Sequence, residues 1–78
     1  MHVEFSDGSL HPCANSIIEI FSQGDQWYLS LTHPLRQKPE LLYSGTEQQA
    51  KKALANLFAK MKDTKVRLVE YKDVVKGV

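Results

Sequence analysis

An apolar stripe through residues 46–62 is the feature that most constrains how this chain can fold. Its members recur three and four residues apart, which places them on one face of an α-helix. No glycine or proline interrupts the segment, and Thr46 and Gln49 have the spacing of a capping box, which predicts where the helix begins. One such helix covers one side of a sheet. The stripe consists of Ala50, Ala53, Leu54, Leu57, Phe58 and Met61.

The rest of the chain has the alternation of short strands joined by tight turns. Residues 22–25 contain Gly24 between two such runs and predict a hairpin turn. The run at 16–21 carries apolar residues on both faces, so we expect that strand to be central or buried on both sides. Residues 11–15 are expected to form a loop or an irregular edge, because Pro12 donates no backbone hydrogen bond. Strands are predicted at 2–6, 16–21, 27–32, 40–44 and 65–71.

These elements predict a single α+β domain over residues 1–78. We expect an antiparallel β-meander of about four strands, followed by one amphipathic helix packed on one face and a C-terminal fifth strand (ββββαβ). The pattern does not decide where the fifth strand pairs. The tail from residue 72 to residue 78 is expected to be frayed or edge-like.

The predicted sheet has apolar side chains on both faces, although one helix covers only one of them. We therefore expect the uncovered face, or an edge strand beside it, to contact another protein, most simply a second copy in a two-fold dimer. The alternative is that these residues are scattered, or covered by the 33–39 loop and the tail. The residues predicted for this interface are Ile17, Phe21, Tyr28, Val69 and Tyr71.

The charge is unevenly distributed although the net charge is only +1. Residues 1–45 hold two basic and five acidic side chains, whereas residues 46–78 hold eight basic and four acidic ones. A lysine-rich solvated helix face is the ordinary explanation. The functional alternative is a weak nucleic-acid-binding protein that uses its basic C-terminal half. The residues predicted for that role are Lys51, Lys52, Lys62, Lys65 and Arg67.

No motif in the sequence predicts catalysis, metal binding or nucleotide binding. The three histidines and single cysteine lack the paired spacing of zinc sites. Activation of Cys13 by His11 or His33 is a distant alternative, and a buried filler role for Cys13 is favoured. We therefore expect a non-enzymatic protein with no metal and no cofactor.

One cysteine forms no intramolecular disulfide, there is no apolar run of about 20 residues, and the polar and acidic residues at 2–4 do not predict a signal peptide. These features predict a cytoplasmic protein that does not contact the membrane. The general layout resembles that of many short bacterial or phage proteins, and this resemblance implies no activity.

Overall fold

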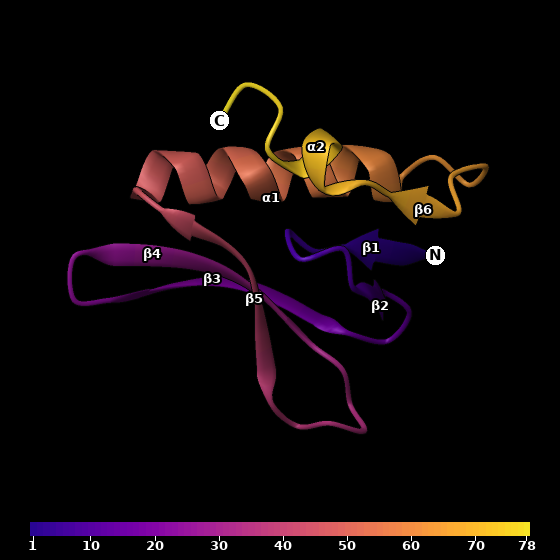
Figure 1. The fold of residues 1–78 in the computed structure, drawn as a ribbon, viewed down its shortest axis with the longest axis horizontal. Coiled ribbons are helices and arrows are strands. Elements are labelled where there is room, and N and C mark those ends of the chain that lie inside the picture. Colours follow the sequence, from indigo (N-terminus) through magenta and orange to yellow (C-terminus); the bar gives the residue numbers. More distant parts are fainter.

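The helix that follows Thr46 lies across a twisted three-stranded sheet in the computed structural model, which covers residues 1–78 (Figure 1). This helix, α1, spans Glu47–Met61. The Gln49 N–H donates to Thr46 Oγ1 at 3.2 Å, and Gln49 Oε1 accepts from the Thr46 N–H at 3.0 Å. The capping box is therefore complete, and the helix begins where the sequence predicts.

The main sheet consists of β3 (Ile17–Gln23), β4 (Gln26–Thr32) and β5 (Pro39–Gly45), all antiparallel, in the order β3-β4-β5. Gly24 adopts a φ of 63°, which a two-residue hairpin loop between β3 and β4 requires, so the predicted turn is confirmed. The expectation that the 16–21 strand is central or buried on both sides is wrong. β3 is an edge strand, because only β4 pairs with it.

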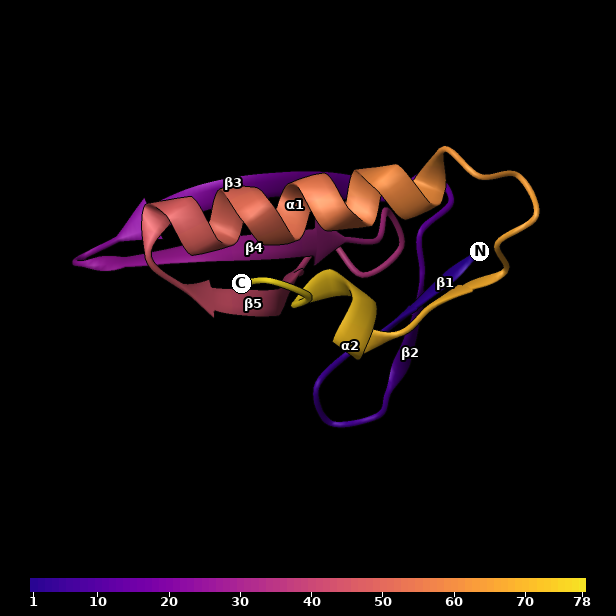
Figure 2. The same ribbon diagram turned by 90° about the horizontal axis from the view of Figure 1, so that it is seen from above.

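A second, smaller sheet lies near the C-terminal end of α1 (Figures 1 and 2). It consists of β2 (Leu10–Pro12), β1 (His2–Glu4) and β6 (Leu68–Val69), in that order. β1 pairs antiparallel with β2 and parallel with β6. The α+β class is confirmed, but the strands divide between two sheets. The predicted loop at 11–15 begins instead within the short strand β2.

The chain after α1 differs from the predicted strand at 65–71. Only Leu68–Val69 forms a strand, and Tyr71–Val74 forms the short helix α2. β6 pairs with β1, which is only three residues long, so the paired part of β6 cannot extend much further. Glu4 Oε1, at the end of β1, accepts the Tyr71 N–H at 3.1 Å. The chain therefore leaves the small sheet and begins a helical turn.

The C-terminal tail is held against α1, so the prediction that residues 72–78 are frayed is wrong. Asn56 on α1 donates both Nδ2 hydrogens, to the carbonyl oxygens of Val74 and Lys76, at 2.8 Å each. Val74 is completely buried. The hydrogen bonds from Asn56 and the burial of Val74 together hold the C-terminal tail in place.

The core lies between α1 and both sheets. On α1, Ala50, Ala53 and Leu57 are completely buried, as the stripe predicts. Phe58 is an exception, because 42% of its surface is exposed. It lies on a flank of α1 and not on the face that meets the sheet. Neither helix combines the length and the apolarity that a membrane span requires. The core cluster contains Val3, Phe5, Cys13, Leu29, Leu31, Leu42, Ala53, Leu57, Val69 and Val74.

Candidate functional site

The strand register of the main sheet separates its two faces. Residues directly opposite each other on paired strands point to the same face, and neighbours along a strand point to opposite faces. Leu29 and Leu31 of β4 pack in the core with Leu57 of α1, so their face is the one that α1 covers (Figure 1). The rows on the other face are Ile17–Thr32–Pro39, Glu19–Ser30–Leu41 and Phe21–Tyr28–Ser44.

Four apolar or aromatic side chains lie in these rows, and we call them the open face: Ile17, Phe21, Tyr28 and Leu41. Ile17 is 57% exposed and Leu41 is 50% exposed. The rings of Phe21 and Tyr28 stack, with centroids 5.3 Å apart. The open face therefore combines a stacked aromatic pair with two exposed aliphatic side chains from the outer strands.

Three of the five residues predicted for the interface lie together on the open face: Ile17, Phe21 and Tyr28. The prediction that Val69 and Tyr71 also lie on the uncovered side is wrong. Val69 is completely buried, because the parallel pairing of β6 with β1 places it opposite Val3 in the core. Tyr71 is half-buried at the start of α2.

Leu41 belongs to the open face but was absent from the sequence prediction. A β-bulge explains why: Leu29 pairs with Tyr43 and Ser30 pairs with Leu41, so Leu42 has no partner on β4. The extra residue lets Leu42 and Tyr43 both pack against the core and leaves Leu41 on the open face. Strict alternation along the sequence contains no signal for such a bulge.

The residues predicted for nucleic-acid binding are all exposed but do not form one patch. Lys51 and Lys62 share a flank of α1, about 16 Å apart along the helix axis. Lys52 is turned about 100° from Lys51 around the helix. Lys51 is also paired with Glu47, with Nζ and Oε1 3.1 Å apart. The other two basic side chains lie in the 63–67 segment, beyond the end of α1.

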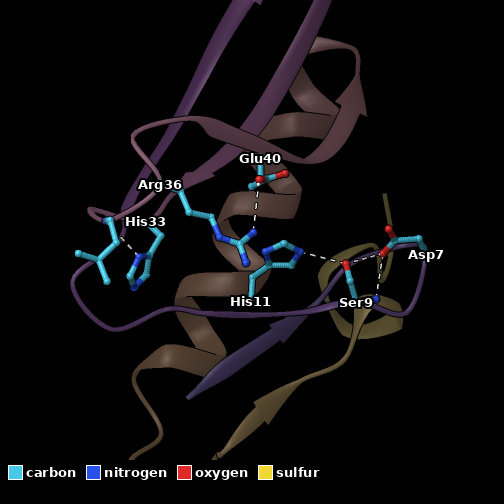
Figure 3. A network of polar contacts seen from close by, with 7 residues as sticks. Asp7, Ser9, His11, His33, Arg36 and Glu40 are labelled. Atoms are coloured by element: carbon cyan, nitrogen blue, oxygen red, sulfur yellow. Dashed lines mark hydrogen bonds and ion pairs between the residues drawn. The ribbon is translucent and has the colours of Figure 1, made fainter.

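A chain of polar contacts braces the turn between β1 and β2 (Figure 3). Ser9 Oγ donates to Asp7 Oδ1 at 2.6 Å and lies 2.9 Å from His11 Nε2. A hydroxyl has one hydrogen, so His11 Nε2 is the donor in the second contact. The hydroxyl proton therefore points to the carboxylate. In a nucleophilic triad it points to the imidazole instead, so this order of groups does not activate Ser9.

The remaining side chains in Figure 3 belong to the 33–39 loop and the start of β5. His33 Nδ1 accepts the Leu35 N–H at 3.2 Å. Arg36 is turned toward Glu40, with Nη1 and Oε1 3.6 Å apart (Figure 3). Both contacts are local and solvent-exposed, and exposed ion pairs of this kind contribute little to stability. They shape the loop.

The Asp7–Ser9 contact makes the first turn sensitive to pH. The Ser9 hydroxyl, and after it the Ser9 backbone N–H, lowers the pKa of the Asp7 carboxyl below its usual 3.8. A lowered pKa in the folded state stabilises the turn at neutral pH, and this contribution is lost as the pH falls through the folded-state pKa. In an NMR titration of the carboxyl carbon, Ser9→Ala should move the Asp7 pKa upward toward 3.8. An unchanged pKa in the variant would show that the hydroxyl has no such role.

Cys13 is buried in the core, and burial raises the pKa of its thiol. This placement agrees with the filler role predicted for it. The structure contains no group of three or more His, Cys, Asp or Glu side chains positioned to hold a metal ion, and its surface has no pocket. Comparison with protein-family models, curated proteins and solved structures found no match to this chain.

Proposed function

We propose that this chain is a non-enzymatic interaction module that associates with a second copy of itself through the main sheet. The open face is the observation that carries the proposal, since four apolar or aromatic side chains lie on the side of the sheet away from α1 and two of them, Phe21 and Tyr28, are stacked. Single exposed apolar residues are ordinary, whereas neighbouring ones on a regular surface are typical of contact sites.

The aromatic pair on the open face supports this function. Phe21 and Tyr28 are stacked in the free chain, so little side-chain entropy is lost when they meet a partner. Aromatic anchors of this kind contribute most of the energy of many interfaces. In a two-fold dimer both copies contribute the same surface, so a second copy of this chain is a sufficient partner.

The surroundings of Ser9 and Cys13 support a non-enzymatic role. The Ser9 hydroxyl donates to a carboxylate, and the Cys13 thiol is buried with a raised pKa. A thiolate is the reactive form of cysteine, and burial of this kind disfavours it. An unpaired thiol is also typical of proteins in a reducing compartment, which supports a cytoplasmic location as part of the proposal.

Analytical ultracentrifugation tests the proposal. At micromolar concentrations the mean mass should rise with concentration from 8.9 kDa toward twice that value. Phe21→Glu should raise the dissociation constant about tenfold or more, because it places a charge within the contact. Leu68→Glu is the matched control: Leu68 is also a partly exposed strand residue, at 42%, but it lies on the small sheet. A wild-type mass that stays at 8.9 kDa over this range would overturn the proposal.

A further inference from the structure

β3 differs from the other free sheet edges in that the charge of Glu19 is its only protection against pairing. Folded proteins commonly blunt an edge strand with proline, lysine, a bulge or short length. β2 is three residues long and ends in Pro12, and β6 has only two residues. β5 begins at Pro39 and carries the bulge at Leu42. β3 has seven residues without proline, lysine or a bulge.

The outward backbone groups of β3 follow from its hairpin. A two-residue loop makes Gln23 and Gln26 exchange both of their backbone hydrogen bonds, and in an antiparallel pair the residues bonded to the neighbour alternate with residues that are not. Ile18, Ile20 and Ser22 therefore turn their N–H and C=O groups away from β4. None of the 15 backbone hydrogen bonds outside the helices and strands involves these residues.

Phe58 gives this edge an apolar neighbour. Asn56 holds the C-terminal tail on one flank of α1, and Phe58 lies about 200° further around the helix. Figure 2 shows α2 and β5 on the same side of α1, with β3 on the other side. The flank of α1 that carries Phe58 is therefore the one on the β3 side of the helix, and 42% of the Phe58 surface is exposed.

We propose that a second copy of the chain pairs antiparallel with β3, with the two-fold axis at Ile20. This inference rests on the proposed self-association and assigns it to the edge of the main sheet: the open faces of the two copies then lie side by side on the side away from α1, and Phe21 is the open-face residue beside the new pairing. The two main sheets join into one six-stranded sheet of order β5-β4-β3-β3-β4-β5, and the two copies of α1 lie on the same side of it. The flanks that carry Phe58 then face each other across the axis.

The hydrogen-bonding positions select this register. With Ile20 opposite its own copy, Ile18 lies opposite Ser22, and the outward groups of both strands form about six hydrogen bonds. Glu19 then lies opposite Phe21 of the second copy. Centring the pair on Glu19 leaves about four hydrogen bonds and places the two Glu19 carboxylates directly opposite each other. Like charges in that position are destabilising.

Proline substitution tests which edge is used. Ser22→Pro removes an N–H that has no partner in the free chain, so the monomer should keep its circular dichroism spectrum while the dissociation constant rises on the order of 100-fold. Ser44→Pro is the matched control, because Ser44 is also exposed and the β4–β5 register turns its N–H outward from the other edge. Ser44→Pro should associate as the wild type does. Loss of the dimer in Ser44→Pro alone would overturn the assignment to β3.

A charge comparison at Phe21 keeps the inference testable if Ser22→Pro fails to fold. Phe21→Lys places an ammonium group opposite Glu19 of the second copy, whereas Phe21→Glu places a carboxylate there, so the dissociation constant of Phe21→Lys should be about tenfold lower than that of Phe21→Glu. Equal weakening of association by both variants would overturn edge pairing in this register and leave association through the open face. A wild-type chain that is monomeric at all micromolar concentrations would overturn the proposed function as well.

Discussion

Leu57→Ala should lower the free energy of unfolding by about 2–5 kcal/mol, which is the usual cost of truncating a fully buried leucine. Leu57 has no exposed surface and packs in the core with Leu29 of β4 and Val74 of α2. The loss combines the transfer free energy of the removed atoms with the cavity that remains between α1 and the sheet. Urea denaturation followed by circular dichroism measures it. Both proteins must be compared at the same concentration, because the proposed self-association would add to apparent stability.

Ala59→Glu is the control for this prediction. Ala59 is exposed and lies about 200° from Leu57 around α1. Glutamate is a good helix former, so the change should alter the free energy of unfolding by no more than about 0.5 kcal/mol. An equal loss in Ala59→Glu and Leu57→Ala would mean that α1 is covered on both sides, which contradicts the structure.

Asn56→Asp should have the second largest effect, through the C-terminal tail. The substitution replaces a donor to two carbonyl oxygens with a carboxylate that repels both of them. We expect a loss of roughly 2–4 kcal/mol, since two hydrogen bonds disappear and a charge remains partly buried. Hydrogen exchange should show much faster exchange at the Val75 and Val78 amides, which bond within the tail.

Asn56→Ala separates the lost donation from the added charge. It should cost less than Asn56→Asp at neutral pH, because it removes the two hydrogen bonds without adding a carboxylate. As the pH falls and the new carboxyl becomes protonated, it regains a donor and the difference between the two variants should shrink. Equal losses at all pH values would show that the charge has no effect at this position.

The elements that the sequence predicts correctly depend on local chemistry. Thr46 and Gln49 cap α1 within four residues of chain, and the apolar stripe determines which face of the helix is buried. The β3–β4 hairpin depends on alternation and on Gly24, whose positive φ is easily adopted by glycine. These signals lie within single elements or single turns, so no knowledge of the tertiary structure is needed to interpret them.

The errors arise where distant segments meet. Alternation at 65–71 predicts a strand, but the length of β1 and the Glu4 contact with Tyr71, 67 residues away along the chain, end that strand after Val69. The same pairing buries Val69, which explains its wrong assignment to the interface. Phe58 is exposed although it continues the stripe, because the main sheet ends at β3 on that side.

The bulge in β5 also determines how large an assembly can become. In two sheets joined at β3, the outermost strands are the two copies of β5, each of which begins at Pro39 and loses regular pairing at Leu42. A third copy meets no continuous ladder of free amides there. In the proposed pair, growth would therefore end at two chains and would not continue into a fibre.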